Sequence, residues 1–152
     1  MQKSSMPNEI ILSEVSRLVS EGEQVVLMTK GVSMLPFIVG NRDSVLLTAP
    51  ESFSVGDIVL ARIDGCRYVL HRVIELDGDS VVLMGDGNIR GVEKCMKSDV
   101  TALALSIIRP DGSRIDCRSE KHLRQARLWR KLLPLRRWIL AVYRRVYLRK
   151  SR

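Results

Sequence analysis

The chain has 152 residues, 45% of them hydrophobic and 28% charged, which allows one domain with its own core plus an appendage. Its net charge of +8 is uneven, because residues 1–117 carry 12 Lys and Arg against 16 Asp and Glu, whereas residues 118–152 carry 13 against one. No window reaches the roughly 20 apolar residues that span a bilayer, and the N-terminus has no apolar run typical of secretion, so we expect neither a signal nor an anchor.

The pattern of apolar residues predicts one short helix followed by a β domain. Apolar residues share one face of a helix over residues 7–22. Short β-type segments then alternate with turns rich in Gly and Asp, which favours a mostly antiparallel domain. The clearest hairpin is ELDGDSVVL, with Asp77-Gly78 at its tip. The predicted strands are 24–29, 44–49, 57–63, 67–76, 80–85 and 99–108.

Between the first two predicted strands lies KGVSMLPF, in which Ser33 stands between Val32 and Met34 and is followed by Pro36. One interpretation is an ordinary turn between strands. The other is a nucleophile held on a turn, because a serine hydroxyl becomes a nucleophile only when a base is nearby. The local sequence leaves both interpretations open.

The candidate base is His71, which lies inside the predicted strand 67–76. A single histidine in a strand is more often a packing or surface residue than a catalytic base. Ser33 by itself is equally weak evidence for a catalytic site. Their order with two further motifs makes a catalytic role more plausible. Along the chain the series is GVSMLP, GDIVLARI, YVLHRVIE and GDGN.

This series resembles the type I signal peptidase and LexA-like superfamily of serine peptidases. SMxP is the nucleophile motif of that superfamily, GDIV matches directly, and GDGN is similar to its GDNx motif. HRV, where most bacterial signal peptidases have a lysine base, resembles the histidine-containing type of the endoplasmic reticulum and archaea. The resemblance covers roughly residues 24–108 and implies the superfamily's β-rich catalytic fold.

The resemblance implies acyl transfer with Ser33 as nucleophile, His71 as general base and Asp86 of GDGN as the third site residue, without cofactor or metal. An aspartate pair that follows this motif in the endoplasmic-reticulum type is missing here. Either Asp86 or Glu93 replaces it as the acid that orients His71, or the site works as a Ser–His dyad. Gly31 supplies no side-chain donor where signal peptidases often have a serine, so the oxyanion donor must be the backbone N–H of Ser33 and a further group.

After about residue 118 the sequence becomes rich in Arg and Leu and loses its β character. We therefore divide the chain into a peptidase-like β domain, 1–118, and a basic amphipathic helical tail, 119–152, which Pro134 should kink. An apolar stripe with two tryptophans and many arginines predicts a helix lying on an anionic membrane surface. The alternative is a helix packed on the β domain with an arginine-rich solvent face. Nucleic acid is not expected, because no recognition motif accompanies the charge. The stripe consists of Leu128, Leu132, Leu135, Ile139, Val142 and Val146.

Together these patterns predict a serine endopeptidase that removes a leader or signal segment from a peptide or protein precursor. The chain has three cysteines, which cannot all pair and which lack CxxC spacing: Cys66, Cys95 and Cys117. This favours free thiols and therefore a cytoplasmic protein. With the basic tail, we expect it to be peripheral on the inner face of the membrane. Two alternatives stay open. One is a signal peptidase that uses the anchor of a partner subunit. The other is a non-catalytic binding module whose basic tail docks on membrane or nucleic acid.

Overall fold

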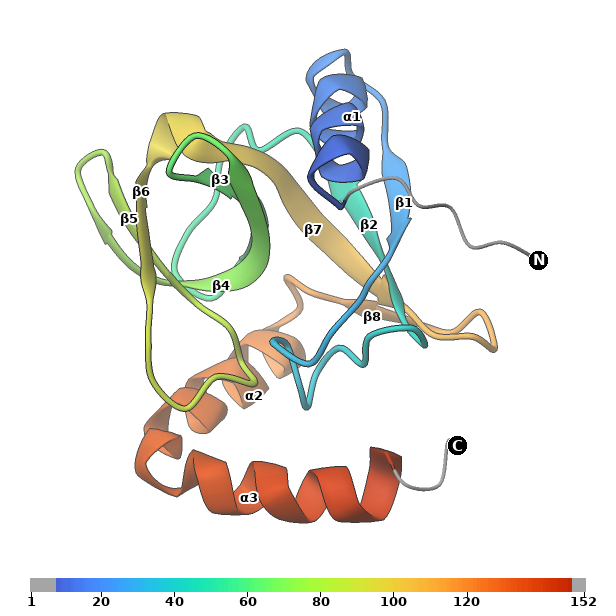
Figure 1. Ribbon diagram of the computed structural model, residues 1–152, viewed down its shortest axis with the longest axis vertical. Helices are drawn as coiled ribbons and strands as arrows, with labels where there is room; N and C mark the ends of the chain where they lie inside the picture. The colour runs from blue at the N-terminus through green and yellow to red at the C-terminus, as the bar shows by residue number, and fades with distance from the viewer. Residues whose placement is uncertain (1–7, 149–152) are drawn as a thin grey trace.

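Eight β-strands form one curled antiparallel sheet within residues 8–148, the part of the chain that the computed structural model describes (Figure 1). The order of hydrogen-bonded strands is β1-β2-β7-β3-β4-β5-β6, and β8 also pairs with β7. The fold is therefore mainly β, as the sequence predicts. The strands are β1 Val25–Met28, β2 Ser44–Thr48, β3 Ile58–Ile63, β4 Arg67–Asp77, β5 Ser80–Met84, β6 Glu93–Met96, β7 Val100–Ile108 and β8 Arg114–Asp116.

Strand β7 organises the sheet. One of its edges pairs with β2, and the other pairs first with β3 and then with β8. The register shifts once in the β2–β7, β3–β7 and β4–β5 pairs, and such bulges increase local twist and bend the strands. The curled sheet encloses two separate apolar clusters, one against α1 (Asn8–Ser20) and one between β3, β4, β5 and β7.

All six strands predicted from the sequence are confirmed within about two residues, and so is the hairpin at Asp77-Gly78. Two strands, β6 and β8, were missed. β6 has the sequence EKCM and alternates only between half-buried and exposed positions, because it lies at the edge of the sheet. β8 has three residues, too few to show a period. Both form because a neighbouring strand offers hydrogen bonds, which a sequence pattern does not display.

The helix predicted near the N-terminus is confirmed as α1, which buries Leu12, Val15 and Val19 against the sheet. It ends at Ser20, and Gly22 follows two residues later with a φ of +92° that suits glycine. In Figure 1, α1 lies near β1 and β2 at one end of the molecule, and the C-terminal helices lie together at the other.

The C-terminal segment forms α2 (Glu120–Lys131) and α3 (Arg136–Tyr143), separated at Pro134 as predicted. The Ser119 hydroxyl caps α2 by accepting a hydrogen bond from a backbone N–H one turn later. Both helices pack on the β domain mainly through Trp129 and Leu140, which are buried, and of the predicted apolar stripe only Leu132 packs against this cluster. The short helical segments are η1 Lys97–Asp99, η2 Leu133–Leu135 and η3 Arg144–Leu148. Among the described residues, no helix has the length and hydropathy to cross a bilayer.

Candidate active site

The loop between β1 and β2 (the β1–β2 loop) carries Ser33, which is half-buried in the wall of a cavity of about 190 Å³. Two glycines let this loop pack closely. The N–H of Gly87 donates to the carbonyl of Ser33 over 2.8 Å, and a Cβ at position 87 would lie 2.2 Å from the carbonyl oxygen of Val32. A Cβ at Gly40 would lie 2.2 Å from the carbonyl oxygen of Gly31. The GDGN segment and the end of the loop therefore clamp the backbone around Ser33.

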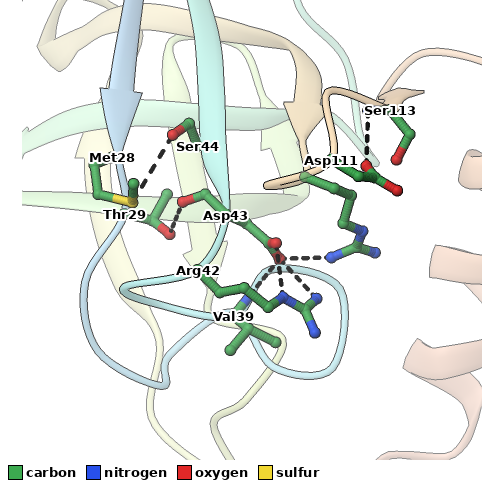
Figure 2. A network of polar contacts seen from close by, with 9 residues as sticks. Met28, Thr29, Val39, Arg42, Asp43, Ser44, Asp111 and Ser113 are labelled. Atoms are coloured by element: carbon green, nitrogen blue, oxygen red, sulfur yellow. Dashed lines mark hydrogen bonds and ion pairs between the residues drawn. The ribbon is translucent and has the colours of Figure 1, made fainter. Parts of the chain in front are cut away.

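A buried carboxylate, that of Asp43, fixes the base of the β1–β2 loop (Figure 2). It accepts hydrogen bonds from the N–H of Val39 at 2.8 Å and from the guanidinium groups of Arg42 at 2.9 Å and Arg109 at 2.5 Å. The backbone carbonyl of Asp43 accepts from the N–H and the hydroxyl of Thr29, at 3.1 and 2.8 Å. Asp43 thus ties both ends of the loop together and to the segment that follows β7.

His71 lies on β4 and lines the same cavity as Ser33. Because β5 pairs with β4 only from Arg72 onward, His71 lies just beyond the end of β5. β6 begins there with Glu93, whose Oε1 lies 2.6 Å from His71 Nδ1. Of the two acids that the sequence offered, Asp86 and Glu93, it is Glu93 that contacts the imidazole.

The surroundings of His71 favour a neutral imidazole. Burial lowers the pKa of His71 below its ordinary value of 6.5, and the carboxylates of Glu93 and Asp86 offset only part of this effect. The Glu93 carboxylate lies in close electrostatic contact with Nδ1 of the buried imidazole. A carboxylate beside Nδ1 favours the proton there and leaves the lone pair of Nε2 available as a base.

Asp86, the third predicted site residue, contacts Arg72 instead of His71. The guanidinium of Arg72 binds both carboxylate oxygens, at 2.9 and 2.7 Å, and both side chains are buried. The backbone carbonyl of Asp86 accepts a hydrogen bond of 2.8 Å from the indole N–H of Trp129. These contacts hold the GDGN segment beside the β1–β2 loop, so Asp86 acts on His71 only through its charge.

Arg72 connects the GDGN segment to α2. Its Nη1 donates to the carbonyl of Gly56 at 2.8 Å and lies 3.3 Å from Nε2 of His122, and its guanidinium lies 5.1 Å from the ring centroid of Phe37. Since a guanidinium can only donate, Nε2 of His122 must accept. Burial, followed by the charge of Arg72, lowers the pKa of His122 to about 4, which keeps this ring neutral. Sequence analysis had given His122 no role.

The backbone N–H of Ser33 is the candidate donor for an oxyanion at this site. Within residues 8–148 neither this N–H nor the Ser33 hydroxyl makes a hydrogen bond. Gly31 has no side chain, and the Thr29 hydroxyl donates to a backbone carbonyl and is not available. A donor at this place is the kind of group that stabilises a tetrahedral intermediate.

Two strands with unpaired edges contribute to the cavity. β1 pairs only with β2 in the described sheet, and the first half of β4 pairs only with β3. Both strands line the cavity. Among residues 8–148, no cluster of three His, Cys, Asp or Glu side chains could hold a metal ion. Polar and apolar surface contribute about equally to the cavity, and the apolar residues in its wall are Leu12, Leu27, Met28, Met34, Ile38, Leu60, Tyr68, Val69 and Leu70.

Comparison with known protein families gives a match over most of the β domain. A family model described as Peptidase S24-like matches residues 3–100, well over half of the chain. The matched segment includes Ser33, His71, Asp86 and Glu93 and leaves out α2 and α3. No curated protein matches the chain.

Proposed function

Because the chain belongs to the Peptidase S24-like family, we propose that it is a serine endopeptidase in which Ser33 is the nucleophile and His71 the general base. The observation that carries this proposal is that both side chains line one cavity while a carboxylate lies beside Nδ1 of the imidazole. Glu93 takes the orienting role. Asp86 contributes as a positioning residue, through Arg72 and the GDGN segment.

The proposed reaction is acyl transfer in two steps. Nε2 of His71 takes the proton of Ser33 as the hydroxyl oxygen attacks the peptide carbonyl, and the resulting oxyanion accepts a hydrogen bond from the N–H of Ser33. The imidazolium returns the proton to the leaving amine as the C–N bond breaks. Water then hydrolyses the acyl-enzyme with His71 as base again. Glu93 stabilises the imidazolium that forms in each step.

We propose that the substrate is a leader or signal segment of a peptide or protein precursor, bound in extended form. The unpaired edges of β1 and β4 support this, because an extended peptide can add to such an edge as a further strand. The cavity of about 190 Å³, about half of whose wall is apolar, is smaller than the ~300 Å³ of ordinary ligand pockets. It suits a small aliphatic side chain beside the bond that is cleaved.

Labelling with a fluorophosphonate probe tests the enzyme. The wild-type chain should be labelled and Ser33→Ala should not react. The labelling rate of His71→Ala should be lower than that of wild type by about 10²-fold or more. Ser52→Ala, at an exposed serine in a loop, is the matched control and should react like wild type. Equal labelling of wild type and Ser33→Ala would rule out the proposed nucleophile. Cleavage of a peptide library by the wild-type chain then identifies the residue before the scissile bond, which we expect to be small.

One observation favours a binding module instead. Ser33 and His71 share the cavity, but within residues 8–148 no hydrogen bond joins their side chains. Such bonds are often long in free enzymes and shorten when substrate binds. The labelling experiment decides between the two functions, because a binding module would leave Ser33 unreactive although the chain is folded.

A further inference from the structure

The outward side of α3 is apolar and exposed. Towards the β domain, α3 buries Leu140. On its other sides Leu135, Trp138 and Val142 are 54%, 62% and 61% exposed, and Ile139 is 37% exposed. Leu135 directly precedes α3, and because Ile139 and Val142 follow it by four and then three residues, the three side chains lie toward the same side of the helix. We call these four residues the α3 apolar face. In Figure 1, α3 is the outermost helix at the end opposite α1.

Cationic side chains surround this face. Between Glu120 and Leu148 the only acidic residue is Glu120 itself. The guanidinium of Arg137 lies 4.9 Å from the ring centroid of Trp138, so the most exposed tryptophan has a cation next to it. Within the described part of the chain, none of the exposed cations of α2, α3 and η3 forms an ion pair with a carboxylate. These cations are Lys121, Arg124, Arg127, Arg130, Lys131, Arg137, Arg144 and Arg145.

We propose that the α3 apolar face docks on the surface of a bilayer that contains anionic phospholipids. An exposed apolar face with a tryptophan can contact the acyl chains of a bilayer, and the flanking cations can contact its anionic headgroups. α3 is eight residues long, about 12 Å, so it can lie in the interface but not span it. A second copy is a poorer partner because it would bring two cationic helices together. A nucleic acid is also poorer, because it would leave the apolar face uncovered.

The docking surface lies against the loop that carries the nucleophile. Leu140, on the inward side of α3, packs in one apolar cluster with Leu35 and Val39 of the β1–β2 loop. A chain docked through α3 would therefore hold the cavity of Ser33 close to the bilayer. The docking itself does not depend on peptidase activity, so it can be tested in the Ser33→Ala variant as well.

Co-sedimentation with vesicles tests the proposal. The full chain should bind vesicles of equal parts phosphatidylcholine and phosphatidylglycerol, and should bind pure phosphatidylcholine at least about tenfold more weakly, with added salt reducing the difference. Tryptophan emission should shift to shorter wavelength on binding. Trp138→Phe should abolish this shift, because Trp129, the other tryptophan, is already buried.

A matched pair of variants isolates the surface. Leu135→Gln with Val142→Gln should weaken binding to the anionic vesicles by about tenfold or more, whereas Val55→Gln with Val92→Gln, at exposed apolar residues elsewhere, should not. Circular dichroism verifies that both variants are folded. The proposal is overturned if wild type binds neither vesicle, if it binds both equally, or if the two double variants bind alike. A different partner would also overturn it. In that case wild type binds no vesicles but self-associates or binds RNA, and the Leu135/Val142 variant loses this property.

Discussion

Nδ1 of His71 lies 2.6 Å from Oε1 of Glu93, at the place where β5 has ended and β6 begins. The two residues are 22 positions apart in the sequence, and no motif connects them. Their proximity depends on the GDGN turn after β5, because the chain returns from this turn as β6, in which Glu93 pairs with Leu83 of β5. A carboxylate placed in this way can fix the tautomer of the imidazole and stabilise its charged form.

Replacing Glu93 should therefore impair catalysis more than folding. We expect Glu93→Gln to lower the rate of labelling by a serine-reactive probe by about tenfold or more, because the tautomer of His71 is no longer held. Glu75→Gln, at an exposed glutamate of β4, is the control and should leave the rate unchanged. A Glu93→Gln variant that reacts as fast as wild type would show that the acid has no orienting role.

The pH dependence should report His71. Burial lowers the pKa of His71 below 6.5, and the protonated ring cannot accept the proton of Ser33. The labelling rate should thus be constant around neutral pH and fall in acid with a midpoint below 6.5. The rate is measured across a pH series in wild type and in His122→Gln, and both should give the same midpoint. A midpoint above 6.5 would mean that the effect of Glu93 exceeds that of burial.

The pair of Arg72 and Asp86 should be mainly structural. Asp86→Ala leaves the buried guanidinium without its partner, and breaking such a pair costs about 3–5 kcal/mol. Urea denaturation should show this loss in Asp86→Ala and in Arg72→Met. The double variant should lose less than the sum, because the two residues interact. If Asp86→Ala kept its stability but lost labelling, Asp86 would have a direct role in the chemistry.

Gly87 should not tolerate a side chain. A Cβ at this position would lie 2.2 Å from the carbonyl oxygen of Val32, so Gly87→Ala must displace the backbone that carries Ser33. We expect a loss of roughly 1–3 kcal/mol in stability and slower labelling. Ile89→Ala, at an exposed residue of the same turn, is the comparison and should change neither quantity strongly. Normal labelling by Gly87→Ala would mean that the loop adapts without cost to the site.

Acid should destabilise the fold partly through His122. In the unfolded chain this ring is protonated below about 6.5, but in the folded protein its pKa is about 4. Between these two values the unfolded state binds the additional proton, so stability decreases as the pH falls. The contribution of His122 is at most about 3 kcal/mol. Urea denaturation near neutral pH and near pH 4 should show a smaller difference in His122→Gln than in wild type, and equal differences would contradict this assignment.

The sequence by itself predicted the elements whose pattern is local. The strands from β1 to β5 and β7, the helix α1 and the break at Pro134 follow from alternation, turn residues and the geometry of proline. The order of the four motifs also predicted membership of the serine peptidase superfamily, which the family match supports, whereas Ser33 and His71 as catalytic partners stay a prediction. The division at residue 118 and the membrane partner of the tail stay predictions.

Which side chains meet depends on the pairing of strands and the packing of helices in the folded chain. Glu93 reaches His71, and Asp86 is taken up by Arg72, because strand pairing and the end of β5 bring residues together that have no periodic relation in the sequence. The same holds for His122, which contacts Arg72 from α2. Helical periodicity predicted a helical tail with an apolar stripe, but the tail is divided into separate helices that bury Trp129 and Leu140 and leave most of the stripe exposed. Which face a helix buries depends on the shape of its neighbour, and that is a property of the whole fold.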